Sequence, residues 1–526
     1  MLVLSEKGLA NRSEWLEKGY VLPAFDRQAM IAATRKAPRW IHFGAGNIFR
    51  AFQCAALQRM LEKGVMDTGM IAVEGYDYEI VEKGYRPCDN YTLLVTLKAD
   101  GAVEKTVVGS IAESCILDSE NAAEYGHLKE IFTNPSLQMA SFTITEKGYA
   151  ITAAAEADFA NGPEKPQSYI GKVASLLYAR YQAGELPIAM VSMDNCSHNG
   201  DKLKAAMEAF AQGWGDAGFQ QYLASGKVSF PWTMIDKITP RPDASVEATL
   251  REDGLQGLEP VVTSKHTYIA PFVNAEESEY LVIEDDFPNG RPPLEEAGFI
   301  LTERETVNKV ERMKVCTCLN PLHTALAVTG CLLGYTRISA EMKDADLLAL
   351  VKRIGYTEGL PVVTDPGVIV PREFIDTVVN VRLPNPFMPD TPQRIACDTS
   401  QKIPIRFGET IKCYLADPAR EAASLTAIPL AIAAWLRYLL GVDDQGQPME
   451  VSPDPLLPEL QGALSGIVLG DPASADGKLD ALLSRADLFA VNLADAGLAD
   501  KVKAFFAAML AGPGAVRATL HKELAE

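Results

Sequence analysis

A lysine, an asparagine and a histidine lie close together in one segment of the sequence, at Lys314, Asn320 and His323. A lysine amine can accept or donate a proton once its pKa is lowered. An asparagine amide can donate a hydrogen bond to a developing alkoxide, and a histidine can hold a substrate hydroxyl. The segment is predicted to be helical, so that Asn320 and His323, three positions apart, share one face. This set suits proton transfer at an alcohol carbon without a metal.

A glycine turn near the N-terminus supplies a candidate site for a hydride carrier. Gly44 and Gly46 follow a predicted strand, residues 40–43, and precede a predicted helix, residues 51–63. Glycines let the backbone approach a pyrophosphate, and the helix N-terminus offers unpaired N–H groups and positive potential. The third glycine of the usual dinucleotide fingerprint is replaced by Phe49. A purely structural turn therefore remains an alternative.

A carboxylate at the end of the next predicted strand bears on the choice of cofactor. Glu74 directly follows residues 70–73, which are predicted to form that strand. Such a carboxylate can accept hydrogen bonds from ribose hydroxyls and repels a 2′-phosphate, which favours NAD over NADP. Asp77 is a rival for this role, and Glu74 could also be an ordinary surface acid.

The remaining pattern predicts an α/β fold with two domains. Short strands are predicted at 92–97, 106–108, 139–145 and 188–193. Their alternation with helical segments indicates a parallel or mixed sheet covered by helices. Turn-forming residues concentrate at 284–293, which is the best boundary candidate. We therefore expect a Rossmann-type domain at residues 1–290 and a mainly helical, substrate-binding and catalytic domain at residues 291–526.

Composition excludes several classes of partner. The net charge of −20 argues against nucleic acid and anionic membranes, although a local cationic pocket could still hold a small anion. Residues 425–441 are apolar but contain Pro429 and Arg437, so we expect a buried helix rather than a membrane span.

Nine scattered cysteines and an N-terminus without a basic leader indicate reduced thiols in a cytoplasm. With six histidines, none paired at ligand spacing, no metal site is expected, and Cys316 and Cys318 are interpreted as small buried residues.

Several motifs then occur in a fixed order along the chain. They are GAGNIFRA at 44–51, TITEKGY at 143–149, SMDNCSHNG at 192–200, FPWTMIDKITP at 230–240, IED at 283–285, GRP at 290–292 and the segment 314–323. Together they resemble the polyol-specific long-chain dehydrogenases, the mannitol dehydrogenase family. The similarity runs from about residue 38 to beyond residue 410, and the C-terminal helical part is compatible with it.

This resemblance implies a metal-independent, NAD(P)-linked interconversion of a secondary alcohol and a ketone on an open-chain sugar derivative. It assigns the catalytic lysine to Lys314 and the substrate-binding histidine to His323. Asn195 and Asn320 become the amides that stabilise the oxyanion, and Glu146 links the lysine to solvent.

The same resemblance assigns binding residues for the substrate and the cofactor. The substrate contacts map to Asp236, Arg394 and Lys402. The cofactor contacts map to Gly44, Gly46, Asn47, Ile48, Arg50 and Glu74.

The chain departs from the family pattern in three places, which suggests a divergent branch. The family usually has five positions from lysine to asparagine, and Lys314 and Asn320 are six apart. A bulge in the helix can absorb one residue, and Lys309 is the alternative lysine. The residues that usually flank the glycine turn are replaced by Ile48, Phe49 and Phe52, and the usual Asn-Gly-Ser-His is Asn-Pro-Leu-His at 320–323.

Arg394 and Lys402 could hold a carboxylate, which favours a sugar acid, although the resemblance implies the same cations in the polyol enzymes. The preference for a sugar acid therefore also rests on the resemblance of the Asn-Pro-Leu-His segment at 320–323. D-Mannonate and D-fructuronate are the preferred pair, with altronate and tagaturonate or mannitol and fructose as alternatives. A non-catalytic NAD-binding sensor is the alternative from another class. Both a monomer and a dimer remain open.

Overall fold

The computed structural model describes residues 1–240 and 244–525, and the chain divides into two units, Met1–Asn308 and Lys309–Glu526. The sequence placed the boundary at residues 290 and 291 instead. Strand β15 (Ile300–Thr302) explains the difference, because it pairs in parallel with β14 (Tyr280–Glu284) and so keeps residues beyond 291 in the first unit. The turn-rich stretch 284–293 is therefore a loop within the first unit.

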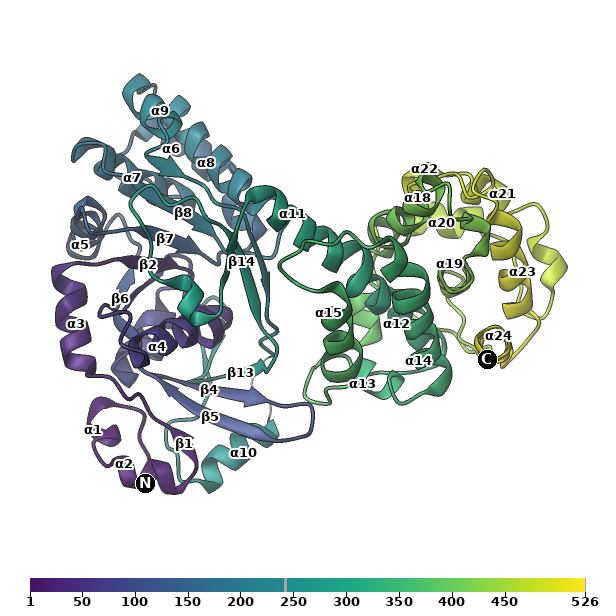
Figure 1. Cartoon of the computed structure of the whole chain (residues 1–526), viewed down its shortest axis with the longest axis horizontal. Helices are drawn as coiled ribbons and strands as arrows, with labels where there is room; N and C mark the ends of the chain where they lie inside the picture. The colour runs from purple at the N-terminus through teal and green to yellow at the C-terminus, as the bar shows by residue number, and fades with distance from the viewer. Residues whose placement is uncertain (241–243, 526) are drawn as a thin grey trace. The chain divides into compact units, whose positions relative to one another are not determined.

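The first unit is built around a six-stranded sheet in the order β6-β3-β2-β7-β8-β9, with all neighbours parallel (Figure 1). Its strands are β2 (Trp40–Phe43), β3 (Met70–Glu74), β6 (Ile111–Ile116), β7 (Met139–Phe142), β8 (Ile188–Ser192) and β9 (Val228–Ser229). This is the doubly wound Rossmann order, in which the chain reverses direction across the sheet between β2 and β7. Ligands bind such sheets at the carboxyl ends of the strands beside this point, so the fold itself marks the edge where β2 and β7 end.

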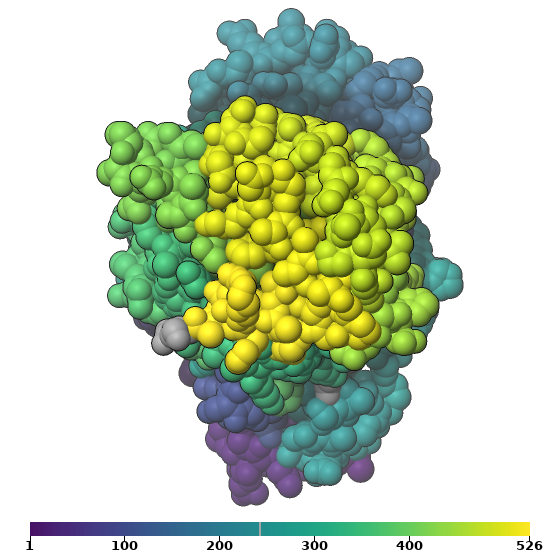
Figure 2. Space-filling model, turned by 90° about the vertical axis from the view of Figure 1, so that its right-hand side faces the viewer, coloured from purple at the N-terminus to yellow at the C-terminus, as the bar shows by residue number. Residues whose placement is uncertain are grey.

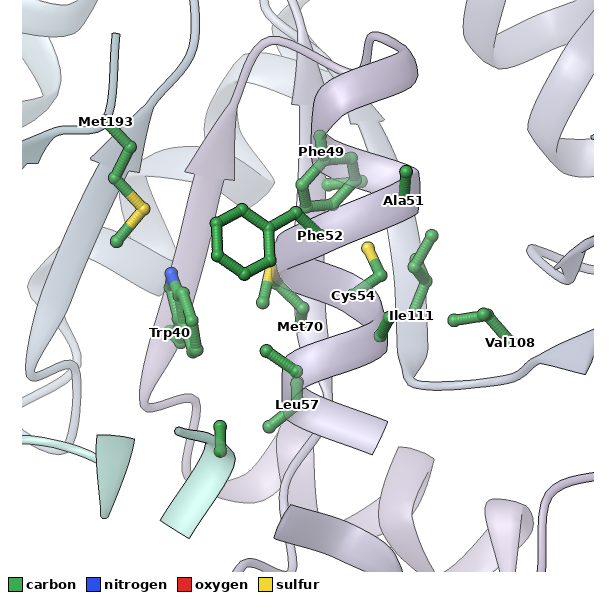
Figure 3. Packing of buried hydrophobic residues seen from close by; sticks show 14 of the residues in the cluster. Trp40, Phe49, Ala51, Phe52, Cys54, Leu57, Met70, Val108, Ile111 and Met193 are labelled. Atoms are coloured by element: carbon green, nitrogen blue, oxygen red, sulfur yellow. The ribbon is translucent and has the colours of Figure 1, made fainter. Parts of the chain in front are cut away.

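Alternation along the strands explains the two buried faces of this sheet. Trp40 and Met70 point to one face, and Ile41 and Phe43 point to the other. On the first face, Phe52 from the helix after β2 packs near Trp40 and Met70 (Figure 3). Because strands in a parallel sheet are covered on both faces, these runs are largely apolar on both faces, with a few buried polar residues such as His42 and Ser141.

Helices of the first unit cover these faces. Their bounds are α3 (Arg27–Lys36), α4 (Cys54–Glu62), α5 (Ala122–Thr133), α6 (Ala153–Asn161), α7 (Tyr169–Gln182), α8 (Asn199–Gly213) and α9 (Ala217–Ala224). The first unit also contains α1 (Glu6–Leu9), α2 (Arg12–Glu17) and α10 (Ala244–Glu252). Side chains of α5, α7, α8 and α9 share one core with β2, β7 and β8, whereas α3 and α4 pack on the opposite face.

Three smaller sheets complete the first unit. Their orders are β1-β5-β4-β13, β10-β14-β15 and β11-β12. The strands not yet introduced are β1 (Tyr20–Val21), β4 (Thr92–Leu97), β5 (Val103–Val108), β10 (Thr233–Asp236), β11 (Val261–Val262), β12 (Tyr268–Ile269) and β13 (Phe272–Glu276). All the strands predicted from the sequence are present, with ends that differ by a few residues.

Every named element of residues 314–525 is a helix. The central ones are α12 (Asn320–Leu332), α19 (Ala427–Tyr438) and α23 (Ala499–Met509). Around them lie α13 (Ile338–Glu341), α14 (Ala345–Lys352), α15 (Pro371–Thr377), α16 (Pro392–Ile395), α17 (Thr399–Ile403), α18 (Glu409–Ala416), α20 (Leu457–Ala463), α21 (Asp480–Leu483), α22 (Ala486–Phe489) and α24 (Ala515–Leu524). The C-terminal residues, drawn in yellow, spread over much of one face of this unit (Figure 2). Every residue of α19 is buried, which confirms the buried helix predicted at 425–441.

One helix, Arg304–Leu332, is long and apolar enough to cross a membrane by length and composition. In the folded chain, 78% of its most apolar window is buried. The core helix of a soluble protein has the same properties, and α12 forms its second half.

A buried carboxyl group in the second unit makes stability depend on pH. Glu341 is fully buried, neither carboxyl oxygen has a hydrogen-bond partner among the described residues, and it faces Gly330 of α12. Burial raises the pKa of Glu341 to about 9, with a smaller contribution from Asp344. Between about pH 4.5 and pH 9 the unfolded chain loses this proton and the folded chain keeps it. The group therefore lowers the free energy of unfolding by about 1.4 kcal/mol for each pH unit in that window.

Glu341→Gln should accordingly stabilise the protein at neutral pH. The amide has the same shape but no proton to retain, so we expect a gain of about 2–3 kcal/mol in the free energy of unfolding at pH 7. Urea unfolding at pH 5 and pH 8 should show the gain mainly at pH 8. The exposed Glu421→Gln is the matched control and should change neither value. A variant no more stable than wild type at pH 8 would show that the carboxyl is ionised and solvated in the folded chain.

Candidate active site

The glycine turn directly follows β2 at the expected edge of the sheet. Gly44 has φ +102° and donates its N–H to Val73 O at 2.9 Å. A Cβ at position 44 would lie 2.2 Å from Thr143 O at the end of β7, so both the backbone angle and the close approach require glycine. A Cβ at Gly46 would meet nothing within 4 Å. Gly44 therefore packs directly against the end of β7, whereas the space beside Gly46 is open and leaves room for a ligand.

A buried arginine forms hydrogen bonds around the start of the helix that follows the glycine turn. Arg50 is 3% exposed, and it donates to Asn47 Oδ1 at 2.8 Å and to Ala270 O at 2.7 Å. Burial lowers its pKa. Ile48 is half-buried against the apolar core. Arg50 thus fixes Asn47 and adds positive charge under the helix N-terminus, where an anion would be favoured.

Glu74 ties the glycine turn to the loop that follows β3. Its carboxylate accepts hydrogen bonds from the N–H groups of Ala45 (3.1 Å), Tyr76 (2.7 Å) and Asp77 (3.1 Å). Two carboxylate oxygens offer about four acceptor positions, so these three bonds leave capacity for one more donor. Glu74 is therefore a fixed negative charge beside the turn, which is the property that the ribose assignment requires.

Asp77, the rival carboxylate, has a different environment. It is 1% exposed and accepts a hydrogen bond from Thr263 Oγ1 at 2.5 Å. Thr263 lies in the turn between β11 and β12, so Asp77 holds that hairpin to the loop after β3. Of the two acids, Glu74 is the one in contact with the glycine turn.

At the carboxyl end of β8, Asn195 lies exposed on a braced turn. The neighbouring Asp194 carboxylate accepts hydrogen bonds from Ile144 N (3.0 Å), Thr145 N (2.9 Å) and Tyr149 Oη (2.5 Å). These bonds join the turn to the loop after β7. Burial nevertheless raises the pKa of Asp194.

A second brace comes from Asn199 at the start of α8. Its side-chain amide is buried, donates to the carbonyls of Ser192 and Asp194, and exchanges hydrogen bonds with Thr233 of β10. Asn195 therefore projects from a turn that is anchored on both sides. This anchoring fixes the backbone from which the amide of Asn195, the proposed oxyanion donor, projects.

Two other predicted residues of the first unit lie at strand or loop ends. Glu146 begins the 3₁₀ turn Glu146–Tyr149 after β7, is 62% exposed, and forms an ion pair with Lys202 at 3.0 Å. Its exposure suits the predicted contact with solvent. Asp236 is buried and ends β10 in the three-stranded sheet, where it pairs in register with Tyr280.

In the second unit, Lys314 lies on a π turn, Lys314–Cys318, between α11 (Arg304–Met313) and α12. Leu319 N donates to Lys314 O at 3.1 Å, which is the i to i+5 bond of this geometry. Lys314 is 4% exposed, whereas Lys309 is half-buried. The π turn accommodates one additional residue, as the sequence prediction of a bulge required. Cys316 and Cys318 in this turn are both buried.

His323 lies one turn into α12, beside an acid that the sequence prediction missed. Its Nε2 is 3.8 Å from Asp390 Oδ2, and the side chain is 17% exposed. Burial lowers the pKa of His323, and the charges of Arg406, Arg382 and Arg394 act in the same direction against Asp390. The imidazole is therefore neutral at neutral pH, with one nitrogen able to donate and the other able to accept.

Four cations surround the start of α12, and we call Arg382, Arg394, Lys402 and Arg406 the cation cluster. Arg406 donates to Thr324 Oγ1 at 2.6 Å and to Asn320 O at 3.4 Å, and burial lowers its pKa to about 10.

The two cations predicted from the sequence, Arg394 and Lys402, already pair with neighbouring groups. Arg394 is 66% exposed and pairs with Asp390. Lys402 Nζ donates to the carbonyls of Ile395 (2.9 Å) and Cys397. Burial and Arg406 lower its pKa. Positive charge exceeds negative charge around His323, as an anionic ligand would require.

The structure thus places the predicted residues in two groups, one in each unit. The first unit holds the glycine turn, Glu74, Glu146, Asn195 and Asp236. The second unit holds Lys314, Asn320, His323, Arg394 and Lys402. Sequence reasoning missed Asp390, Arg406 and the roles of Asp194 and Asn199. The spacing of Asp390 and Arg394, four residues apart, was an available signal, since such pairs meet on a helical turn.

Comparison with known proteins assigns both units. Residues 38–296 match the family model of the mannitol dehydrogenase Rossmann domain, and residues 306–510 match that of the mannitol dehydrogenase C-terminal domain. A D-mannonate oxidoreductase of Thermotoga maritima is 51% identical over 99% of this chain and 98% of its own length. A polyol:NADP oxidoreductase of Gluconobacter oxydans is 30% identical over 81% of this chain and 85% of its own length. The mannitol 2-dehydrogenase of Pseudomonas fluorescens, solved with NAD and D-mannitol, superposes with a TM-score of 0.71 at 25% identity over the full length of both chains.

Proposed function

The chain belongs to the mannitol dehydrogenase family, and from that premise we propose that it is an NAD-linked oxidoreductase that interconverts D-mannonate and D-fructuronate. The 51% identity to a D-mannonate oxidoreductase over nearly the whole of both chains supports this choice of substrate. The single structural observation that carries it is the cation cluster. A sugar acid brings a carboxylate, and three arginines act on His323 against one acid, Asp390.

The residues of the first unit fit a dinucleotide. The open space at Gly46, the N–H groups of the helix that follows and the buried charge of Arg50 suit a pyrophosphate, and Glu74 suits an unphosphorylated ribose. When bound, NAD accepts or supplies the hydride. The protein's own task is then to hold the sugar and to move the proton of the reacting hydroxyl.

We assign that proton transfer to Lys314. In oxidation its amine takes the hydroxyl proton, and in reduction it returns a proton to the alkoxide. Asn320 and Asn195 donate hydrogen bonds to the oxygen as its charge develops. Neutral His323 holds a substrate hydroxyl, and the Asp390 carboxylate lies 3.8 Å from its Nε2. Asp236, Arg394 and Lys402 are the proposed contacts to the rest of the sugar, and Glu146 is the proposed link to solvent.

Arg394 requires a change of partner in this proposal. It pairs with Asp390 in the structure, and a substrate carboxylate would compete for the same guanidinium. Arg394 is 66% exposed but Asp390 is only 9% exposed, so the exchange costs the removal of one partner from a buried carboxylate. Arg406 is the better fixed cation, since its hydrogen bonds to Thr324 and Asn320 hold it at the helix start.

The proposal also covers location and assembly. We propose that the protein acts in the cytoplasm, which rests on the scattered, unpatterned spacing of its nine cysteines in the sequence. We propose a small sugar acid as the partner and neither nucleic acid nor membrane, with a monomer or dimer as the working form. Altronate and tagaturonate, or mannitol and fructose, are the competing substrate pairs.

Initial rates with NADH and three keto sugars test the choice of substrate. We expect kcat/KM for D-fructuronate to exceed that for D-tagaturonate and for D-fructose. A preference for fructose would contradict the sugar-acid proposal and favour a mannitol dehydrogenase activity. NADH binding without turnover on any of the three would instead favour a sensor.

The position of Glu74 predicts a preference for NADH over NADPH. A 2′-phosphate at this ribose would lie beside a fixed carboxylate, and such a like-charge contact costs several kcal/mol. We expect kcat/KM for NADH to be at least about tenfold higher, and Glu74→Gln, which keeps the shape, should narrow the difference. Asp77→Asn is the matched control and should leave the ratio unchanged. Equal use of both cofactors by the wild type would mean that Glu74 serves only the backbone of the turn.

A further inference from the structure

Three potential metal ligands of the first unit converge outside the site described above. Glu113 and Cys115 lie on β6, and His127 lies on α5. One ligand atom from each, a carboxylate oxygen, the thiol sulfur and an imidazole nitrogen, all lie within 4.8 Å of one another. His127 Nε2 is 3.1 Å from Glu113 Oε1. These atoms belong to neither the glycine turn nor the proposed catalytic residues.

The fold brings the three side chains together for simple reasons. Glu113 and Cys115 are two positions apart on a strand, so they point to the same face. That face is covered by α5, which begins where Asn121 accepts a hydrogen bond from Glu124 N. His127 lies three positions after Glu124, on the same side of the helix. Because β6 is the edge strand of the sheet, the cluster borders solvent, and His127 is 43% exposed.

A neighbouring hydrogen bond joins strand β6 to helix α5. Glu124 Oε2 accepts a hydrogen bond from Ile116 N at 3.2 Å, and its Oε1 pairs with Arg86 at 2.5 Å. The two backbones that carry the ligands are therefore joined independently of the ligands themselves. A metal ion would therefore find the backbone of the site already in place, with only side-chain shifts required.

We propose that Glu113, Cys115 and His127 bind a divalent transition-metal ion, with zinc as the best match. Sulfur, nitrogen and oxygen ligands in one set are typical of zinc, which is usually tetrahedral. Metal–ligand bonds of this kind require ligand atoms roughly 3.3–3.5 Å apart. The existing separations reach that range with side-chain shifts of about 1 Å, and a water can take the fourth position.

The surroundings favour a cation here. Besides Glu113, the carboxylates of Glu124 and Glu130 lie close by, and the guanidinium of Arg86 pairs with Glu124. Glu130 Oε2 is 3.8 Å from His127 Nδ1, the nitrogen that faces away from Glu113. A carboxylate on the far nitrogen of a metal-bound histidine orients the ring and raises its basicity. The Cys115 thiol, whose pKa burial raises, would release its proton when the metal binds.

The position of the ion suggests a structural rather than a catalytic role. Cys115 pairs in register with Val73 of β3, and Glu74 follows Val73. A metal would therefore fasten the edge strand to α5 next to the strand that carries the cofactor carboxylate. This inference does not depend on the proposed substrate or on the role of Lys314.

Cobalt titration of the full chain tests the site. Protein stripped with a chelator and then freed of it should bind one equivalent of Co²⁺, with the near-ultraviolet absorption of a cobalt–thiolate bond, and Zn²⁺ should displace it. His127→Ala and Glu113→Gln should weaken Co²⁺ binding at least about tenfold. Cys115→Ser should abolish the thiolate band. His521→Ala is the matched control, because His521 pairs with Asp346 at 2.9 Å without a cysteine.

The variants also show whether the metal binds at Cys115 or at another cysteine. Zn²⁺ should raise the melting temperature of the wild type and of His521→Ala, but not that of His127→Ala. A wild type that takes up no equivalent of metal would overturn the proposal. A thiolate band that persists in His127→Ala with unchanged affinity would also overturn it, since the sulfur would then belong elsewhere. The exposed His127 can be replaced with little effect on folding, so the test does not rest on Cys115→Ser alone.

Discussion

Replacing Lys314 by alanine should lower kcat for the reduction of D-fructuronate by at least about 100-fold. A positioned acid or base contributes about that factor or more to proton transfer, and alanine offers no proton. The lysine is buried on a π turn, a feature that often marks functional sites. Steady-state kinetics with NADH would measure the loss, and NADH affinity should change little because Lys314 is not among the proposed cofactor contacts.

Lys309→Ala is the decisive companion variant. It removes the alternative lysine from the turn before Met313, in the same helical segment. If Lys309→Ala is the damaging change and Lys314→Ala turns over normally, the catalytic assignment moves to Lys309. Turnover should also survive a chelator, because none of the residues assigned to proton transfer is part of the metal cluster.

Replacing Asn320 by alanine should lower kcat by about 100- to 1000-fold, which is the usual cost of removing one oxyanion donor. The contact strengthens only as charge develops on the oxygen, so kcat should fall far more than KM rises. His323→Ala provides the contrast. A residue that holds a hydroxyl in both ground and transition states should raise KM as well.

This test requires that the Asn320→Ala variant keeps the fold of the wild type. Asn320 is also the first residue of α12, and its carbonyl accepts from Arg406. Alanine keeps that carbonyl, so the helix and Arg406 should stay in place. Unchanged kcat in a folded Asn320→Ala protein would remove the amide from the mechanism and leave Asn195 as the proposed donor.

The sequence predicted the parts of the fold that local patterns encode. Runs such as 40–43 and 70–73 are short, apolar and followed by glycine or acid, and each is a strand. The strand order could not be derived in this way, because it depends on which strands pair across the chain. The turn-rich stretch 284–293 was expected to hold the boundary between the domains, whereas the two compact units divide between Asn308 and Lys309. The pairing of β15 with β14 keeps residues 300–302 in the first unit and leaves no local signal in the sequence.

The candidate site shows the same division. Lys314, Asn320 and His323 could be found from residue type and spacing, and the family resemblance added Asn195 and the distal cations. Asp390 was missed because it lies in the loop before the four-residue helix α16, so its four-residue spacing to Arg394 is informative only once that helix is recognised. The three bonds from backbone amides to Glu74 were also beyond the sequence, because they join two loops that meet only in the folded sheet.

The most direct test of the proposed reaction follows the hydride itself. Wild-type protein would be incubated with D-fructuronate and NADH that carries deuterium at the transferable position of the nicotinamide, and the product examined by NMR and mass spectrometry. We expect D-mannonate with one deuterium on the new carbinol carbon. Absence of D-mannonate, or D-mannonate without deuterium, would contradict NAD-linked reduction of this sugar acid.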